Sequence, residues 1–276
     1  MIDLKANEPT MGVGIGALIG DWLKNATLPI LTCLFFFALW EALVRLLNVP
    51  LYILPAPSVV FAEFGSKFGL IWQHTLVTAW ETLIGFIIAV ALGIPLSILV
   101  AFSEVLQRTL YPAAVTLEMV PKIAFAPIFV IWFGFSFASK MLVVFLVCFF
   151  PIMINGIFGF LSLSPELRQF SLSTGADAIT TFWKIRLPAA LPQLFVGLKG
   201  AAINATVGAT IAEWIGGNAG LGYYIQVASG EFNMELALAA IFMLTALGLI
   251  LYFLVIAAEI KLIPWHESQR RELAGF

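Results

Sequence analysis

Long apolar runs separated by short polar connectors dominate this chain. A helix needs about 20 mostly apolar residues to cross a hydrocarbon core of about 30 Å. Runs of that kind occur six times, and two of them carry no charged side chain. The predicted spans are residues 28–47, 76–102, 116–138, 141–163, 190–212 and 236–258. We therefore expect an all-α, polytopic membrane protein with six transmembrane helices.

The composition excludes several other classes of protein. Of 276 residues, 61% are hydrophobic and 11% are charged, whereas soluble domains are about 45–50% apolar and about 25% charged. The net charge of −2 excludes a nucleic-acid binder, which needs a basic surface. Cys33 and Cys148 both lie in apolar runs, so we expect small hydrophobic side chains there and neither a disulfide nor a metal site.

Small residues at four-residue spacing predict how the helices pack, because close backbone approach drives association in lipid. The second span carries one such stripe and the fifth span carries two, which indicates that the fifth span is central. The stripes are Gly85, Ala89 and Gly93; Gly197, Ala201, Ala205 and Ala209; and Gly200, Asn204, Gly208 and Ala212.

The third span contains Pro121 and Pro127. Proline removes a backbone donor and kinks or breaks a helix. Such breaks are tolerated in membranes where the freed groups face protein or a water-lined cavity. The third span is therefore a candidate wall of a translocation pathway, although a kink needed only for packing has the same signature.

The distribution of Lys and Arg predicts the orientation, because basic residues concentrate in cytoplasmic segments. With six spans and both termini inside, nine basic residues fall in cytoplasmic segments and three in external ones. The nine are Lys5, Lys24, Arg108, Arg168, Lys184, Arg186, Lys261, Arg270 and Arg271, and the three are Arg45, Lys67 and Lys140. We expect cytoplasmic N- and C-termini.

No enzyme constellation is present, so we predict that the chain is not an enzyme. His74 and His266 are far apart at span edges, and no phosphate-binding G-x-x-x-x-G-K-[ST] motif occurs. The charged residues in the spans lie near span ends, where their side chains are expected to reach the interface. These residues are Glu81, Lys122, Lys199 and Glu213. Few ionisable groups at the midplane indicate that the driving energy comes from a partner.

The segment 164–192 is the longest polar connector, and it is predicted to be cytoplasmic. Ser164 and Pro165 are typical of a helix start, Gly175 interrupts the pattern, and Asp177 is a candidate cap for a second helix over 178–186. Phe182, Trp183 and Ile185 give that second helix an apolar face. We expect a helix–glycine–helix element that docks another protein.

The spacing of Gly175, Ile185, Leu187 and Pro188 resembles the EAA loop of binding-protein-dependent ABC-importer permeases. Gln169, Phe170 and Ser171 stand where that loop has Glu-Ala-Ala, so its acidic contact has no counterpart here. Further blocks resemble the branch that imports nitrate, sulfonate, taurine, bicarbonate or pyrimidine precursors of thiamine. These blocks are residues 120–134, 174–177, 187–192, 212–222 and 264–266.

The resemblance implies a type I ABC-importer permease fold in the bacterial inner membrane. It implies a homodimer that forms the pathway, two cytoplasmic ATPase subunits that carry Mg-ATP, and an external solute-binding protein. The chain itself would hold no cofactor. The residues implied to dock the ATPase are Thr174, Gly175, Ala176, Asp177, Ile179, Ile185, Leu187 and Pro188.

The candidate pathway residues lie on the third to fifth spans. They are Met119, Pro121, Ile123, Phe125, Asn155 and Asn204. Asn204 has an alternative role as an interhelical hydrogen-bonding group. The chain divides into an N-terminal cytoplasmic or membrane-surface segment (1–27), a permease domain (28–266) and a cytoplasmic tail (267–276).

Two other functions stay open. An ion-coupled secondary carrier predicts uptake by the chain alone, and a membrane scaffold predicts no ATPase partner. For an ABC importer, the sequence leaves both small anions and pyrimidine- or riboflavin-type heterocycles as substrates.

Overall fold

The computed structural model describes residues 15–163, 165–173, 175 and 177–265. Most of the predicted N-terminal segment, the tail after Trp265, and the candidate residues Ser164, Thr174, Ala176 and His266 lie outside the described residues. The chain divides into two units. One contains the first 47 residues and the C-terminal end from Trp265, and the other runs from Asn48 to Pro264. We call the second unit the bundle.

In the first unit, helix α1 (Ile15–Leu46) carries the first predicted span. Its stretch Thr27–Leu46 is long and apolar enough to cross a membrane. The side chains of Leu31, Phe35 and Phe36 are exposed, as lipid-facing residues are. The helix is described from Ile15 and therefore includes residues 15–27 of the predicted N-terminal segment.

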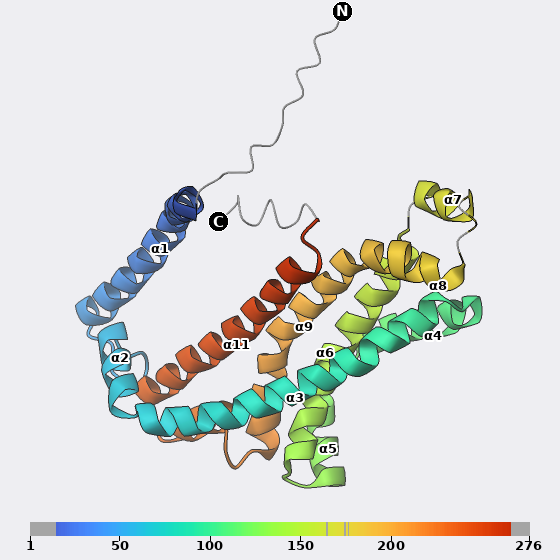
Figure 1. The fold of residues 1–276 in the computed structure, drawn as a ribbon. Helices are drawn as coiled ribbons and strands as arrows, with labels where there is room; N and C mark the ends of the chain where they lie inside the picture. The colour runs from blue at the N-terminus through green and yellow to red at the C-terminus, as the bar shows by residue number, and fades with distance from the viewer. Residues whose placement is uncertain (1–14, 164, 174, 176, 266–276) are drawn as a thin grey trace, which may run out of the picture. The chain divides into compact units, whose positions relative to one another are not determined.

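The described part of the bundle consists of helices and connectors, without strands (Figure 1). Its elements are α2 (Pro57–Ser66), α3 (Phe68–Ala101), α4 (Glu104–Met119), η1 (Lys122–Phe125), α5 (Ala126–Phe133), α6 (Phe137–Leu161), α7 (Pro165–Ser173), α8 (Ala178–Thr181), η2 (Phe182–Arg186, a π-helical turn), α9 (Leu187–Gly216), α10 (Leu221–Gly230) and α11 (Met234–Leu262).

The second, fourth, fifth and sixth predicted spans correspond to α3, α6, α9 and α11, which are long and apolar enough to span a membrane. The third prediction, 116–138, has wrong bounds. Its place is taken by α4 and the η1–α5 segment, which together pass the same test and are bent by 84° at the break. Counting this bent pair as one span gives six among the described residues, which confirms the expected fold class.

The small-residue stripes mark helix contacts as predicted. A Cβ atom added at Gly85 on α3 would lie 2.6 Å from Val144 Cβ on α6. One added at Gly197 on α9 would lie 2.8 Å from the backbone oxygen of Pro151, also on α6. Only glycine permits these approaches, so α6 lies between α3 and α9 with its backbone close to both.

The two stripes of α9 differ in how closely they are packed against other helices. Ala201, Ala205 and Ala209 of the first stripe are fully buried, and the Cys148 thiol donates to the Ala201 carbonyl oxygen at 3.4 Å. In the second stripe Gly208 approaches Val144, but a Cβ at Gly200 would meet nothing within 4 Å. The bundle therefore covers one side of α9 and leaves the side bearing Gly200 uncovered.

Candidate functional site

The predicted docking loop is built from two short helices joined by a turn at Gly175, whose φ of +63° is a left-handed conformation that favours glycine. Asp177 caps α8 by accepting a hydrogen bond from the Thr180 amide at 3.4 Å. This hydrogen-bonding by Thr180 holds the pKa of the Asp177 carboxyl below its usual value. The hydroxyls of Ser171 and Thr181 lie 3.2 Å apart and connect α7 to α8. The predicted helix–glycine–helix element and its Asp177 cap are thus present.

The end of the second helix was predicted wrongly. The helical segment does not end before Pro188 but continues through the η2 turn directly into α9. Pro188 lies in the first turn of α9. The second helix of the predicted docking loop is therefore continuous with the transmembrane helix α9.

The apolar residues of η2 face in two directions. The ring of Phe182 packs against Phe102 and Phe160, with centroid distances of 5.6 and 6.1 Å. The Arg186 guanidinium lies 4.7 Å from the Phe102 ring. These contacts hold the loop on the ends of α3 and α6. Trp183, predicted to share the apolar face of Phe182, is instead 62% exposed.

The outward surface of the loop comprises Gly175, Asp177, Ile179 and Trp183. Ile179 is 70% exposed, and a Cβ at Gly175 would meet nothing within 4 Å. Two large exposed apolar side chains near the carboxylate that caps α8 are typical of a protein-docking surface. Ile185, Leu187 and Pro188, the other predicted docking residues, are half-buried and support the loop from the bundle side.

The pathway candidates of the third span lie around the break between α4 and η1. Met119 is 80% exposed, and Pro121 and Ile123 are also exposed. Phe125 instead lines a small cavity of about 180 Å³ under the break, together with Lys122 and Phe150. The Lys122 ammonium donates to the Glu118 backbone oxygen at 2.7 Å and pairs with the Glu118 carboxylate at 2.9 Å. Lys122 thus stabilises the carboxyl end of α4 at the break.

The two asparagine candidates occupy different environments. Asn155 donates to the Pro151 carbonyl oxygen at 2.8 Å and accepts from the Gln193 amide at 2.9 Å. Its polar atoms therefore join α6 to α9. Asn204 is exposed on α9, on the uncovered side that also bears Gly200. The structure does not bring Asn155, Asn204 and the residues of the α4 break into one site.

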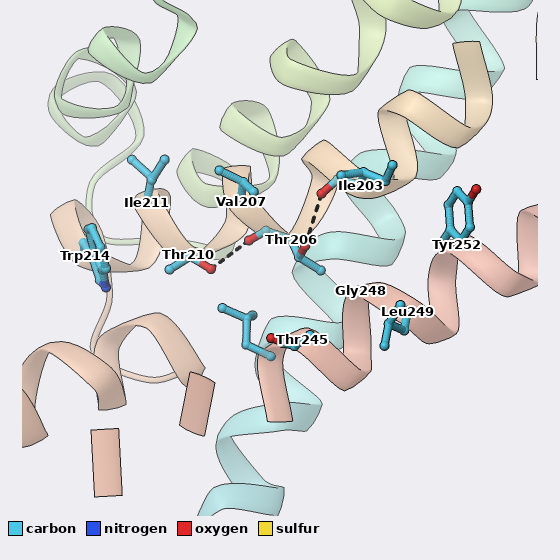
Figure 2. Close-up of a pocket in the computed structure, with 11 residues that line it drawn as sticks. Ile203, Thr206, Val207, Thr210, Ile211, Trp214, Thr245, Gly248, Leu249 and Tyr252 are labelled. Carbon is cyan, nitrogen blue, oxygen red and sulfur yellow. Dashed lines mark hydrogen bonds between the residues drawn. The ribbon is translucent and has the colours of Figure 1, made fainter. Parts of the chain in front are cut away.

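A groove between α9 and α11 has a volume of about 560 Å³. Figure 2 shows Trp214 and Tyr252 at opposite ends of the groove and Thr206, Thr210 and Thr245 between them. The remaining lining residues are aliphatic side chains and Gly248. No lining residue is charged, so the groove offers aromatic faces and hydroxyl oxygens to a bound molecule.

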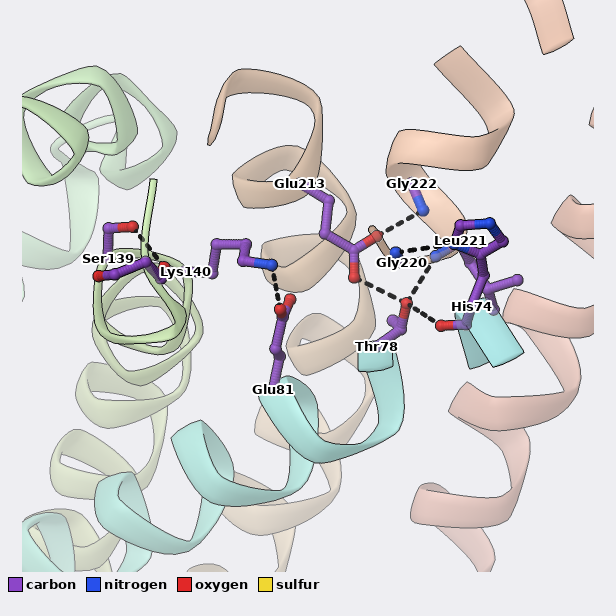
Figure 3. Close-up of polar contacts among 10 residues, drawn as sticks. His74, Thr78, Glu81, Ser139, Lys140, Glu213, Gly220, Leu221 and Gly222 are labelled. Atoms are coloured by element: carbon purple, nitrogen blue, oxygen red, sulfur yellow. Dashed lines mark hydrogen bonds and ion pairs between the residues drawn. The ribbon is translucent and has the colours of Figure 1, made fainter. Parts of the chain in front are cut away.

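A buried polar cluster joins α3, α6 and α9 (Figure 3). Glu81 and Glu213 are completely buried. The Lys140 ammonium forms an ion pair with Glu81, and the Thr78 hydroxyl donates to Glu213 Oε1 at 2.7 Å. The prediction that Glu81 and Glu213 reach the membrane interface is wrong, because both carboxyls have partners inside the bundle. Lys140, counted among external charges, is also buried.

The same cluster holds the glycine-rich connector between α9 and α10. The Gly222 amide donates to Glu213 Oε2 at 2.5 Å, and the Leu221 amide donates to the Thr78 hydroxyl at 2.7 Å. The Gly220 amide donates to His74 Nδ1 at 3.1 Å, and His74 stacks on Tyr224. These hydrogen bonds satisfy the amides at the start of α10. His74 is therefore an internal acceptor within α3 and not a surface group.

A third ion pair joins Lys199 on α9 to Glu259 on α11. Lys199 Nζ lies 3.0 Å from Glu259 Oε2, and both side chains are largely buried. The sequence carried a signal for these pairs that the prediction did not use. Lysines and glutamates occur within or beside apolar segments in similar numbers, and charges in a low-dielectric interior are stable chiefly when paired.

Comparisons with known proteins agree with this architecture. Residues 93–260 match the family model described as "Binding-protein-dependent transport system inner membrane component". The formylaminopyrimidine transport permease protein of Halalkalibacterium halodurans is 34% identical over 87% of this chain and 96% of its own length. The riboflavin transport system permease protein of Chloroflexus aurantiacus is 35% identical over 86% and 89%. The taurine transport system permease protein of Escherichia coli is 28% identical over 95% and 91%.

The family match covers more than half of the chain, and the relatives align along nearly their whole length. The helical bundle with its apolar spans is the architecture that a multi-pass membrane subunit requires. The chain belongs to the binding-protein-dependent transport system inner membrane components, the permease subunits of ABC importers for small solutes.

Proposed function

We propose that this chain is the pathway-forming subunit of an ATP-driven importer in which two copies assemble with two ATPase subunits. An external binding protein delivers a small solute, and both termini of the chain face the cytoplasm. The observation that carries the proposal is the docking loop, which exposes Ile179 and Trp183 and continues without interruption into α9. The relatives' names include both a heterocycle and a sulfonate as solutes.

The mechanism follows from the continuity of this connection. Nucleotide binding closes the ATPase pair and moves the two docking loops together. Because α8 and η2 of the loop lead directly into α9, the movement is transmitted to the helix whose uncovered side bears Gly200 and Asn204. Alternating access then arises from differential stabilisation of inward- and outward-facing states. Mg-ATP is bound and hydrolysed on the partner ATPase.

The test replaces Gly175 with tryptophan. A bulky side chain there projects from the docking surface without meeting another part of this chain, since no atom lies within 4 Å of its Cβ. Gly175→Ala is the matched control, because alanine meets the same left-handed φ of +63° but adds no bulk to the docking surface. We expect Gly175→Trp to abolish ATPase co-purification and solute-stimulated hydrolysis, and Gly175→Ala to retain both.

Normal assembly and stimulation in Gly175→Trp would refute the docking role of the loop. The ion-coupled carrier makes a different prediction, namely gradient-driven uptake by the purified chain alone. Membership in a binding-protein-dependent family argues against that alternative. Uptake into proteoliposomes with and without the ATPase distinguishes the two functions.

A further inference from the structure

We propose that the groove between α9 and α11 is a binding site for one acyl chain of a membrane phospholipid, in the leaflet at the α10 end of the bundle. The site goes beyond the proposed transport function, because it requires only that the chain spans a membrane. Three observations carry it: the chemistry of the lining, the length of the groove along α9, and the close approach of the two helices at its floor.

The lining of the groove is suited to a hydrocarbon chain. None of the described lining residues is charged. The hydroxyls of Thr206, Thr210 and Thr245 donate to backbone carbonyl oxygens of their own helices at 3.3, 2.7 and 2.9 Å. An apolar molecule can therefore lie against these hydroxyls without leaving their protons unpaired. The other polar side chains of the lining are Trp214 and Tyr252, whose rings are largely apolar.

The length of the groove matches one leaflet of a bilayer. On α9 the groove runs from Ile203, near the middle of the helix, to Trp214, close to the end of the helix at Gly216. A rise of about 1.5 Å per residue makes this stretch about 16 Å long, and half of a hydrocarbon core of about 30 Å is about 15 Å. Trp214 then lies between hydrocarbon and headgroups, where tryptophan is enriched. An acyl chain whose headgroup lies near Trp214 would fill the groove to its other end.

The groove opens on the surface of the bundle. Ile203 and Val207 on α9 are 56% and 49% exposed, and Leu249 on α11 is 50% exposed. All three residues line the groove. Its volume of about 560 Å³ lies in the range of small-molecule sites. A space of this size between two membrane-spanning helices is filled either by lipid or by another protein segment.

The floor of the groove favours an acyl chain over another helix. Thr206 faces Gly248 (Figure 2), and a Cβ atom added at Gly248 would lie 3.2 Å from Thr206 Oγ1. The two helices thus approach closely at the floor, and larger side chains such as Val207 and Leu249 line the groove beside it. A further helix would need small residues here for its backbone to come close, as Gly197 permits between α9 and α6. A single flexible hydrocarbon chain has no such requirement.

The experiment places the full chain in nanodiscs with phosphatidylcholine that carries a photoreactive diazirine in one acyl chain. Excess unlabelled lipid is exchanged in before irradiation, which removes weakly held lipid. We expect the retained cross-links to map to the groove and not to the surroundings of Trp80, which is 59% exposed on α3 outside the groove. Thr245→Phe, which adds a ring to the lining, should lower the retained cross-links by about tenfold. Ile250→Phe is the matched control, because Ile250 is 58% exposed on α11 and does not line the groove.

Two further measurements distinguish lipid from other occupants. In detergent, added dioleoyl phosphatidylcholine should raise the midpoint of thermal unfolding of the wild type and of Ile250→Phe more than that of Thr245→Phe. Dihexanoyl phosphatidylcholine, whose chains are too short to fill the groove, should raise it less. Thr245→Cys, in a chain that also carries Cys33→Ala and Cys148→Ala, should resist a charged, membrane-impermeant thiol reagent.

Equal retention of cross-links in the groove and around Trp80 would overturn the inference, as would unchanged retention in Thr245→Phe. Labelling of Thr245→Cys by the charged reagent would mean that water fills the groove, and a disulfide between two copies of Thr245→Cys would mean that a second copy covers it. Either result would also overturn the lipid site. None of these measurements uses the ATPase or a solute. Loss of the lipid site therefore leaves the importer function standing, and failure of ATPase docking leaves the lipid site standing.

Discussion

The hydroxyl of Thr78 on α3 lies 2.7 Å from the carboxylate of Glu213 on α9, although 135 positions separate the two residues. Thr78 also accepts from the Leu221 amide, and Glu213 accepts from the Gly222 amide. One pair of side chains therefore joins two transmembrane helices and fixes the start of α10. With the neighbouring Glu81–Lys140 pair, it forms a polar centre inside the bundle.

Lys140→Met should destabilise the bundle by about 3–5 kcal/mol, because it leaves Glu81 buried without its cation. The measurement is the midpoint of thermal unfolding in detergent. The double variant Lys140→Met/Glu81→Leu should recover most of the loss, since replacing both partners by apolar groups removes the uncompensated charge. Equal unfolding midpoints for the wild type and Lys140→Met would contradict a stabilising ion pair.

Gly197→Val should disrupt the contact between α9 and α6. Its Cβ would lie 2.8 Å from the Pro151 carbonyl oxygen, and overpacking of this kind costs about 1–3 kcal/mol or more. Gly200→Val is the matched control on the same helix, because its Cβ would meet nothing within 4 Å. The midpoint of thermal unfolding should be lower in Gly197→Val than in Gly200→Val. Loss of transport in Gly200→Val at an unchanged unfolding temperature would support a pathway or dimer role for that side of α9.

Ile179→Asp and Trp183→Ala should each weaken binding of the ATPase subunit by about tenfold or more, equivalent to about 1.4 kcal/mol. Both residues are large, apolar and exposed on the docking loop. Trp72→Ala removes an exposed tryptophan from α3, outside the loop, and should bind the ATPase normally. The measurement is the affinity of the ATPase subunit for the permease, which is held in nanodiscs on a sensor surface. Unchanged affinity in both loop variants would exclude these side chains from the interface.

The Asp177 cap should depend on pH in a defined direction. Hydrogen bonding by Thr180 lowers the pKa of Asp177 in the folded loop. Its stabilising contribution is therefore complete above the ordinary Asp pKa of about 3.9 and is lost as the pH falls through the lower, folded value. Protection of the Thr180 amide against hydrogen exchange, corrected for the intrinsic exchange rate, should therefore decrease when the solution is acidified. Asp177→Asn keeps a capping oxygen without the titration, so its protection should not show this acid step.

Features that depend on local sequence were predicted well. Apolar runs of hydrocarbon length identified α3, α6, α9 and α11, because a span must satisfy its backbone hydrogen bonds within itself. The left-handed turn at Gly175 and the cap at Asp177 also followed from residues a few positions apart. The stripes of Gly85 on α3 and Gly197 on α9 correctly marked faces that approach α6, whereas Gly200 in the second α9 stripe meets no neighbour.

Features that depend on contacts between distant segments were missed. The bounds of the third span failed because the break between Met119 and Lys122 turns the chain by 84°, and α4 is less apolar than the other spans. Glu81 and Lys140 were assigned to an interface and an external connector, whereas α3 and α6 bring them together in the interior. The hydrogen bond from the Gln193 amide to the Asn155 side-chain oxygen, which joins α9 to α6, was also not predicted.

The sequence by itself determined the lipid environment, the helical class and the helix–glycine–helix element, since each rests on composition or on short-range spacing, and its motifs carried the resemblance to the family. The tertiary structure alone decided which charges are paired and which side of α9 is uncovered. Whether a buried carboxylate is stable depends on partners within a few ångströms, and those partners come from helices far apart in the chain.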